Sequence, residues 1–530
     1  MVVSSEIESF VASLEERAAP LERAADEAWW RLETTGTEEA RAEAVRAAGA
    51  HDELFADPEA FEKIVRWYGE RSSIERPVLR RQVEVLHAEF AARQGDRRLL
   101  GRVEELEAEA GAIFGNHRGT VDGRKIGDNE IRQILRFSED EDERRAAWEA
   151  SRSVGREVEG VVRELARLRN RLAREQGYEN HYERALRLQE IEPLWLEETM
   201  RRLQEATEAP FRRLREKMDA ETRRRFGTGE TRPWHLPDPF FQEPPEDPDL
   251  DVDRYLQGRK IEELALATYD AMGLDVRGVL ARSDLYERPG KSQHAFCISI
   301  GREYPYDVRV LANLRPDAYW METLLHELGH AAYDRNINPS LPYFLRSVAH
   351  TSTTEAVALM MGALATEAGW LSSIAGAEEA VRDRKKLEER ERAARLVFVR
   401  WALVMYRFER ELYADPDRDD LNGLWWDLVE ELQLVRRPEG RREHDWAAKI
   451  HLAVSPVYYH NYVLGHLIAA QLRHHLETYV TRGHFYESRS AGLYLVEALF
   501  GPGARESWRA TVERATGEPP DTARFVEALG

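Results

Sequence analysis

The stretch Leu324-Leu325-His326-Glu327-Leu328-Gly329-His330-Ala331-Ala332 places two histidines four positions apart within an apolar segment. Its apolar residues recur at helical spacing, and Asp317 stands where a helix N-cap is expected. Side chains four positions apart share one face of a helix, so His326 and His330 can bind one metal ion. Glu327 points to the adjacent face, where it can act as a general base on a water held by the metal.

Two histidines supply only part of a metal site, because catalytic zinc usually takes three protein ligands. A third histidine in a Gly-x-x-His continuation is absent, since the chain runs Tyr333-Asp334-Arg335-Asn336 after His330. Glu355 is an isolated acid that leads a long apolar segment, so a carboxylate from this later helix is the expected third ligand. The sequence therefore predicts one zinc ion bound by His326, His330 and Glu355.

Composition restricts the class of protein. Of 530 residues, 42% are apolar and 33% are charged, which is typical of a globular chain, and no apolar run is long enough to span a membrane. The net charge of −21 argues against nucleic acids and anionic membranes as partners. Cys297 is the single cysteine, and the first residues do not resemble a secretory signal, so we expect a cytoplasmic protein.

Helical periodicity dominates the chain. The sequence predicts helices within residues 5–115, 128–188, 193–225, 252–282, 345–369, 377–413, 421–434 and 446–475. Gly115 to Gly123 read as a loop, and Pro20 is a candidate break in the first helix. Six prolines crowd the segment from Pro233 to Pro248, whose aromatic residues favour a packed loop over a free linker.

The only convincing strand signals lie directly before the metal helix. Residues 294–300 and 308–314 are short apolar runs separated by a turn that contains Gly and Pro, so they predict a β-hairpin. An exposed edge of such a hairpin can bind an extended peptide as an additional strand. A hairpin with a purely structural role fits the sequence equally well.

A second cluster of polar groups lies between Lys449 and Tyr462. Tyrosine hydroxyl and histidine N–H groups stabilise the oxyanion that forms when a peptide bond is attacked. Lys449 can bind the carboxylate of a free peptide C-terminus. The alternative interpretation is a helix-loop-helix whose aromatic residues only pack.

These segments together resemble the angiotensin-converting-enzyme (peptidyl-dipeptidase A) family of zinc peptidases. The resemblance rests on the motif His326–His330 with Glu355, on His294-Ala295, and on Lys449-Ile450-His451 followed by Ser455-Pro456 and paired tyrosines. Weaker similarities spread it over nearly the whole chain: Trp29-Trp30, Ala147-Trp148-Glu149, Gly177-Tyr178 and Trp425-Trp426.

The resemblance implies a mainly α fold, a two-lobed helical shell around a deep channel, with one small β-hairpin beside the metal helix. It implies a single peptidase unit over residues 1–530, in which residues 1–250 form mostly an N-terminal helical lobe and residues 251–530 hold the zinc-site core and the C-terminal helices. The implied activity is release of C-terminal dipeptides from oligopeptides.

The resemblance also implies a role for each candidate residue. The zinc ligands would be His326, His330 and Glu355, and Glu327 would activate water. Tyr462 and His451 would stabilise the oxyanion. The implied substrate-binding residues are Lys449 and Tyr459 for the C-terminal carboxylate, and His294 and Ala295 for the peptide backbone.

The sequence departs from the family at four places. Either Tyr458 or Tyr459 can be the first of the paired tyrosines. His460 and Asn461 stand where the family has a chloride-binding arginine, and Leu359 stands where it has an aspartate four residues after the third zinc ligand. The family's carboxylate-binding glutamine has no counterpart beside Trp234, where the chain has His235 and Leu236.

Other functions share parts of this pattern. Metallocarboxypeptidases of similar length have the same arrangement of zinc ligands, and so do thimet-type oligopeptidases, although the Gly-Tyr-x-x-Gly-Tyr loop of the latter is absent here. A helical shell that binds peptides without cleaving them is the alternative outside catalysis; the presence of all three ligands and the base argues against it.

Overall fold

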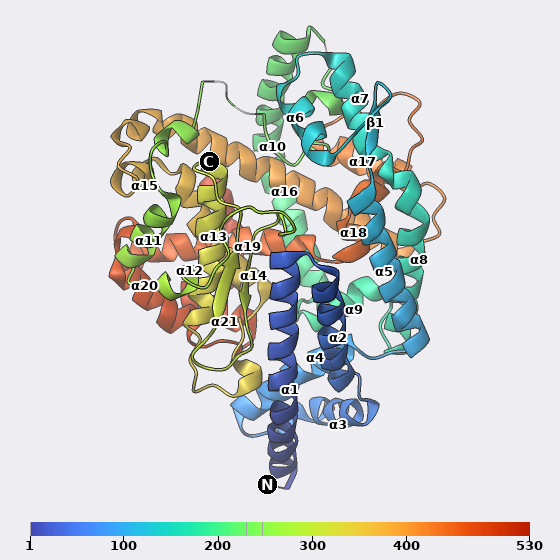
Figure 1. Cartoon of the computed structure of the whole chain (residues 1–530), viewed down its shortest axis with the longest axis vertical. Helices are drawn as coiled ribbons and strands as arrows, with labels where there is room; N and C mark the ends of the chain where they lie inside the picture. The colour runs from blue at the N-terminus through green and yellow to red at the C-terminus, as the bar shows by residue number, and fades with distance from the viewer. Residues whose placement is uncertain (1, 229, 246, 248, 530) are drawn as a thin grey trace. The chain divides into compact units, whose positions relative to one another are not determined.

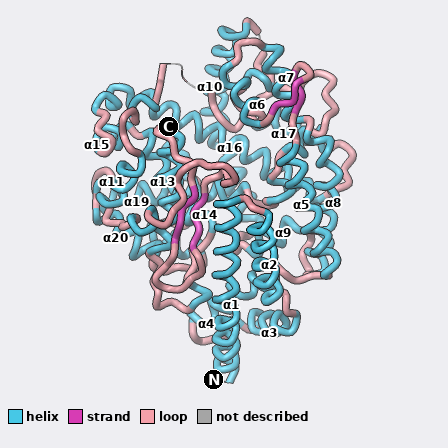
Figure 2. Tube along the Cα trace, in the orientation of Figure 1, coloured by secondary structure: helices cyan, strands magenta, loops and turns pink. Residues whose placement is uncertain are grey.

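The computed structural model describes residues 2–228, 230–245, 247 and 249–529, so Pro248 of the proline-rich segment lies outside the described residues. Figure 2 shows that helices make up most of the chain. The α-helices are α1 Val2–Thr35, α2 Glu38–Phe55, α3 Pro58–Gly69, α4 Pro77–Ala92, α5 Arg97–Asn116, α6 Asp128–Phe137, α7 Glu141–Arg152, α8 Val154–Glu175, α9 His181–Leu188, α10 Pro193–Phe226, α11 Ile261–Ala271, α12 Arg277–Leu280, α13 Ala318–Arg335, α14 Thr351–Gly362, α15 Ala368–Ser373, α16 Arg384–Ala414, α17 Leu421–Gln433, α18 His451–Val454, α19 Tyr459–His475, α20 Arg489–Leu495, α21 Trp508–Thr516 and α22 Ala523–Leu529. The predicted mainly α class is confirmed.

The chain forms two compact units. Unit 1 comprises Met1–Gln94, Asp251–Leu387 and Leu464–Phe525, and unit 2 comprises Gly95–Leu250, Glu388–Val463 and Val526–Gly530. Each compact unit combines segments from residues 1–250 and from residues 251–530. The expected division of the chain into two lobes at residue 250 stays a prediction.

In the part of the chain that the structure describes, four short strands form two antiparallel hairpins. Strands β3 (Phe296–Ser299) and β4 (Val308–Leu311) pair with Phe296 opposite Leu311, which confirms the predicted hairpin before the metal helix. A second hairpin, β1 (Gly119–Val121) with β2 (Arg124–Ile126), lies where the sequence predicts a loop. Its strands are too short to show alternation. The turn residues between them, Asp122 and Gly123, both have positive φ, as tight hairpins require.

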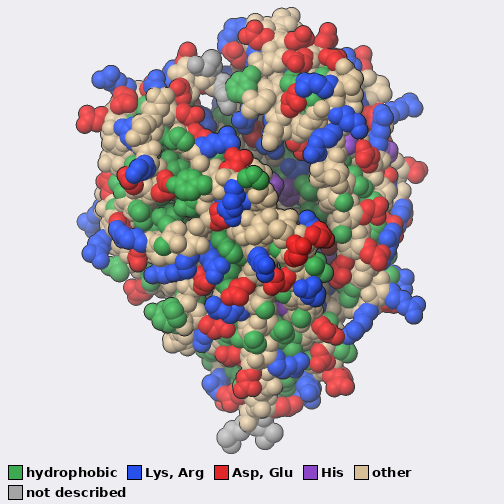
Figure 3. All heavy atoms as spheres, viewed as in Figure 1, with side chains coloured by type: hydrophobic (Ala, Val, Ile, Leu, Met, Phe, Trp, Pro, Cys, Tyr) green, Lys and Arg blue, Asp and Glu red, His purple; other side chains and the backbone are tan. Residues whose placement is uncertain are grey.

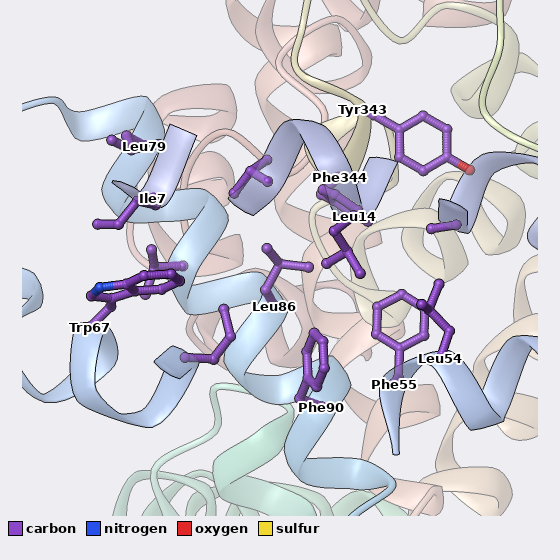
Figure 4. Close-up of a cluster of buried hydrophobic side chains, with 14 of the residues drawn as sticks. Ile7, Leu14, Leu54, Phe55, Trp67, Leu79, Leu86, Phe90, Tyr343 and Phe344 are labelled. Atoms are coloured by element: carbon purple, nitrogen blue, oxygen red, sulfur yellow. The ribbon is translucent and has the colours of Figure 1, made fainter. Parts of the chain in front are cut away.

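A hydrophobic cluster holds the N-terminal helices of unit 1 together. Helices α1 and α2 pack along each other, as Figure 1 shows. Figure 4 shows buried side chains from α1 to α4 gathered in one cluster. Among the members of the cluster are Ile7, Leu14, Phe55, Trp67, Leu86, Phe90 and Phe344. Helix α1 continues through Pro20 without ending there.

The proline-rich segment belongs to unit 2 and is packed. Trp234 is 7% exposed, Leu236 2% and Phe241 5%, so these three side chains are buried, and Phe240 is half-buried. The prediction of a packed loop is confirmed. Among the helices that the structure describes, none combines the length and the apolar character needed to cross a membrane.

Candidate active site

Helices α13 and α14 of unit 1 bring the three predicted metal ligands together. The Nε2 atoms of His326 and His330 are 3.3 Å apart, and His326 Nε2 lies 3.7 Å from a carboxylate oxygen of Glu355. One ligand atom from each of the three residues lies within 4.8 Å of those of the other two. Glu327 follows His326 on α13 and is buried.

The spacing of these atoms fits a tetrahedral zinc ion. Ligands at about 2.05 Å from a tetrahedral centre are about 3.3 Å apart, which is close to the separation of the two imidazole nitrogens. Two imidazoles and a carboxylate are also the ligand types that catalytic zinc prefers, with a fourth position left for water. The residues present therefore fit the metal that the sequence predicts.

Burial sets the charge state of the metal ligands. It lowers the pKa of His326 to about 4, and burial together with the neighbouring His326 lowers the pKa of His330 to about 3. Both imidazoles are therefore neutral at pH 7, which is the form that binds metals. Burial raises the pKa of Glu355 to about 7. Burial, and to a lesser extent the charge of Glu355, raises the pKa of Glu327 to about 8, against the backbone N–H of Cys297 in β3.

Close contact between helices fixes the distance from Glu355 to the two histidines. A Cβ atom on Gly329 of α13 would lie only 2.8 Å from the Cα atom of Ala358 in α14, so no larger residue fits there without moving a backbone. Gly465 of α19 makes a similar approach on the other side of α14, where an added Cβ would lie 3.1 Å from the Cβ atom of Glu355. Small residues thus let three helices meet at the site.

Hydrogen bonds hold the metal helix at its start and next to its first ligand, and orient its second ligand. Asp317 caps α13 by accepting from the N–H of Trp320 at 2.8 Å, as predicted. The hydroxyl of the fully buried Tyr269 in α11 donates to the carbonyl oxygen of Leu325 at 2.6 Å. Nδ1 of His330 lies 2.7 Å from the hydroxyl oxygen of Thr354. With Nε2 directed to the metal, Nδ1 carries the proton and donates to Thr354.

Leu359 has a packing role at the position where the resembling family has an aspartate. An added Cβ on Gly465 would lie 3.2 Å from the Cδ1 atom of Leu359, so this side chain lies at the contact between α14 and α19. Thr354, which directly precedes Glu355, supplies the hydrogen bond to a zinc ligand instead. The sequence contains this threonine, but nothing in its spacing distinguishes it from the neighbouring threonines.

His294 and Ala295 directly precede β3, which contacts α13. His294 is exposed and Ala295 is half-buried. β3 pairs with β4 on one side, and among the described residues no strand pairs with its other edge. The structure therefore places both predicted backbone-binding residues beside the metal helix and a strand edge without a strand partner, while their role in binding stays a prediction.

The second predicted cluster lies in unit 2 and centres on Lys449, whose side chain is buried. The Lys449 ammonium group lies over the rings of Phe240 at 4.7 Å, Trp401 at 5.1 Å and Tyr459 at 5.6 Å. Its hydrogen-bond acceptor is the side-chain oxygen of Gln242, at 3.4 Å. Burial lowers the pKa of Lys449 to about 7. Aromatic faces favour the charged ammonium, which partly offsets the desolvation cost.

Gln242 is the residue that sequence reasoning missed. The sequence places His235 and Leu236 where a carboxylate-binding glutamine is expected, but His235 instead bonds Glu141 at 2.9 Å and Leu236 is buried. Gln242 lies six residues after Leu236 and reaches Lys449 through the loop between them. Residue spacing alone could not predict the contact between Gln242 and Lys449, because the path of the proline-rich loop decides which of its side chains reaches Lys449.

Tyr458 and Tyr459, the two candidates for the first paired tyrosine, have different neighbours in the structure. Tyr459 is 5% exposed and its ring lies beside the Lys449 ammonium group and the ring of Trp401. Tyr458 packs against Tyr462, with ring centroids 5.1 Å apart. Tyr459 is therefore the tyrosine next to Lys449. Its ring is also 5.1 Å from that of His451.

His451 is held as a neutral imidazole. Burial, and next the positive charge of Lys449, lowers the pKa of His451 to about 4. Its Nδ1 atom is buried and has no hydrogen-bond partner among the described residues. A proton on Nε2 leaves this side chain able to donate one hydrogen bond.

The two residues at the position of the family's chloride-binding arginine form hydrogen bonds with another side chain of the protein. His460 and Asn461 are buried, and both bond the side-chain oxygen of Gln189, at 3.1 Å and 2.9 Å. The amide of Gln189 also reaches the carbonyl oxygen of Val457 at 3.4 Å. Gln189 thus holds the start of α19, which carries Tyr459 and Tyr462.

Comparison with known proteins agrees with this site. The sequence model described as angiotensin-converting enzyme, a peptidase family, matches residues 2–228 and 234–526, which is nearly the whole chain. A search of curated proteins finds no match. The match covers the metal ligands, the strand edge and the Lys449 cluster alike. Together with the fit of His326, His330 and Glu355 to zinc, this establishes that the chain belongs to the angiotensin-converting-enzyme family of zinc peptidyl-dipeptidases.

Proposed function

We propose that Glu327 is the general base of peptide hydrolysis and that His326, His330 and Glu355 hold the zinc ion. A zinc ion in this position supplies Lewis-acid chemistry, polarising a carbonyl group and making water more acidic. Glu327 takes the proton from the attacking water and delivers it to the leaving amine. The observation that carries this proposal is the approach of three metal-binding side chains to within 4.8 Å, with Glu327 next to them on α13.

The cluster in unit 2 supplies the proposed hydrogen-bond donors and the cation. Tyr462 and His451 donate to the oxyanion of the tetrahedral intermediate. Lys449, Gln242 and Tyr459 bind the C-terminal carboxylate of the peptide. The buried ammonium group of Lys449, surrounded by aromatic rings and with an amide oxygen as its acceptor, supports this role. Recognition of a free carboxylate is what restricts cleavage to the C-terminal end of a substrate.

His294 and Ala295 are the proposed contacts to the backbone of the substrate. An extended peptide that pairs with the β3 edge opposite β4 is held by main-chain hydrogen bonds, which do not depend on its side chains. The N–H of Cys297 in β3 also bonds the carboxyl of Glu327, so the strand and the base are linked. Broad acceptance of peptide sequences follows from this mode of binding.

Peptides are the substrates of the family, and we propose that nucleic acids and membranes are not partners of this chain. The net charge of −21 repels both phosphate backbones and anionic lipid surfaces. On the face drawn in Figure 3, Lys and Arg side chains are mixed with Asp and Glu side chains. A single cysteine, Cys297, supports a cytoplasmic location.

Mass spectrometry of a decapeptide tests the proposal directly. The free-acid peptide and its C-terminal amide are each incubated with the protein, with and without a zinc chelator. We expect successive loss of dipeptides from the free acid, little cleavage of the amide, and no cleavage with chelator. Loss of single residues would assign the chain a carboxypeptidase activity, and internal cuts in both peptides an oligopeptidase activity. Absence of cleavage with zinc bound would contradict the catalytic proposal.

A further inference from the structure

Residues 238–243 of unit 2, here the 238–243 loop, turn around one buried carboxylate. Asp238 is 2% exposed. One of its oxygens accepts from the N–H of Phe240 at 2.9 Å, and the other accepts from the N–H groups of Gln242 at 3.0 Å and Glu243 at 2.9 Å. A carboxylate with this many backbone donors fixes the path of the chain as a turn residue does.

The carbonyl groups of the same loop are also bonded. The side chain of Gln433 in α17 donates to the carbonyl oxygens of Phe241 at 2.8 Å and Phe240 at 3.3 Å. The indole N–H of Trp148 donates to the carbonyl oxygen of Pro239 at 3.2 Å. Phe241 has φ of 60°, a left-handed conformation that a bulky residue adopts only where its surroundings enforce it. The loop is therefore held in one conformation.

This anchored loop supplies two of the groups that face Lys449. The ring of Phe240 lies under the ammonium group, and Gln242 gives it its hydrogen-bond acceptor. The acids of the loop are engaged elsewhere: Asp238 bonds backbone N–H groups, and Glu243 pairs with Arg136 at 2.6 Å. Within the described residues Lys449 has no ion-pair partner, so its charge is available for an anionic ligand.

We infer that Asp238 is a positioning residue for recognition of the substrate's C-terminal carboxylate, because it holds the 238–243 loop so that Gln242 and Phe240 lie against Lys449. The inference rests on the proposed carboxylate recognition and extends it to a residue that does not touch the peptide. With its oxygen accepting from Lys449, the NH₂ group of Gln242 is the donor left for the carboxylate.

Asp238→Asn is the variant that separates positioning from mere packing. It keeps the shape of the side chain but replaces one acceptor oxygen by a donor, which then faces backbone N–H groups. The loop must shift to relieve this mismatch, and Gln242 shifts with it. A hydrogen bond to a charged group contributes enough that its loss changes affinity about tenfold or more.

The experiment compares a free-acid oligopeptide with its C-terminal amide, using the zinc-loaded full chain. The readout is the ratio of kcat/KM for the acid to kcat/KM for the amide, together with KM, kcat and zinc content. We expect Asp238→Asn and Gln242→Ala each to lower this ratio about tenfold, mainly through KM for the acid, at unchanged zinc content. If Asp238→Asn fails to fold, Gln242→Ala can still overturn the inference, because a wild-type ratio in that variant would mean that the side chain positioned by Asp238 takes no part in recognition.

A matched control is Asp140→Asn. Asp140 also accepts two backbone N–H groups in unit 2, at the start of α7, but asparagine caps helices as well as aspartate does. The control should keep the wild-type ratio. A large wild-type ratio that either test variant retains would overturn the inference alone. A wild-type ratio near one would overturn the proposed carboxylate recognition, and the inference with it.

Discussion

The metal site of unit 1 and the Lys449 cluster of unit 2 are constructed in different ways. The metal ligands lie on two helices that touch at glycine, so backbone contact between Gly329 and Ala358 sets their spacing. The Lys449 cluster is assembled from a loop, a 3₁₀ segment and the start of a helix, and side chains such as Asp238 and Gln189 hold these pieces through backbone hydrogen bonds.

Two buried ionisable side chains, Arg169 and Glu409, hold the segment that carries His451 as well. Arg169 donates to the carbonyl oxygens of Leu452 at 3.3 Å and Ala453 at 2.5 Å, at the end of α18. Glu409 accepts from the N–H of Val457 at 2.6 Å, where φ is positive. We therefore expect substitutions in the metal site to abolish nearly all activity. Substitutions in the Lys449 cluster should reduce activity by degrees, and mainly for substrates with a free C-terminus.

The largest effect is expected for Glu327→Gln. The amide keeps the size of the side chain but cannot take a proton from water, so kcat should fall by about 10²- to 10⁴-fold. Zinc content should stay near one ion per chain, because Glu327 is not one of the three ligands. Steady-state kinetics with a free-acid peptide and elemental analysis of the purified variant measure both. Activity near that of the wild type would remove Glu327 from the mechanism.

Thr354→Val tests how the metal site is supported. The change removes the acceptor of the His330 Nδ1 proton, which should lower zinc affinity about 10- to 100-fold. Competition with a chelator of known affinity measures this, and kcat at saturating zinc should change much less. Thr354→Ser keeps the hydroxyl group and is the matched control. Equal zinc affinity in both variants would show that the hydrogen bond does not orient the ligand.

The metal site was more fully predictable from the sequence than the Lys449 cluster, because its ligands lie on regular helices and the cluster is built from irregular segments. Helical periodicity places His326, Glu327 and His330 in space from their spacing alone, and an isolated acid such as Glu355 stands out in an apolar helix. The β3–β4 hairpin was predictable because its strands are apolar runs, whereas the strands of β1–β2 are too short to carry a pattern.

The arrival of Gln242 at Lys449 could not be predicted, because the loop from Trp234 onward has no repeating geometry. Its course depends on the Asp238 carboxylate, on Gln433 from a distant helix and on the left-handed conformation of Phe241. Such contacts between residues far apart in sequence leave no local signal. The replacement of the chloride-binding arginine was visible from His460 and Asn461, but their shared partner Gln189 was not.

Gly329→Ala tests the claim that backbone contact sets the geometry of the metal site. The added Cβ would lie 2.8 Å from a backbone atom of α14, so the helices must separate. We expect a loss of about 1–3 kcal/mol in the free energy of unfolding and weaker zinc binding, because Glu355 moves with α14. Thermal unfolding of the metal-free and zinc-loaded forms measures both effects.

The matched control for this change is Gly160→Ala in helix α8. A Cβ atom at Gly160 would meet nothing within 4 Å, so alanine should leave stability unchanged or raise it by about 0.5–1 kcal/mol through its higher helix propensity. If both variants unfold alike, close packing of α13 on α14 does not limit the site.

The smallest expected effect is the change of KM with pH, and it is the effect most specific to the Lys449 cluster. Burial lowers the pKa of Lys449 to about 7; Asp238 and Glu243 oppose this shift, while Arg132 and Arg152 reinforce it. In the free protein the ammonium group is therefore lost as the pH rises through about 7, and with it the attraction for a carboxylate. We expect KM for a free-acid peptide to rise several-fold between pH 7 and pH 8, up to the tenfold limit for one proton, while KM for the matching amide changes little.

Steady-state kinetics of the two peptides over this range measure the difference. Because both peptides depend equally on the zinc site, a parallel change in their KM values would assign the pH dependence to the metal centre, whereas divergence assigns it to Lys449.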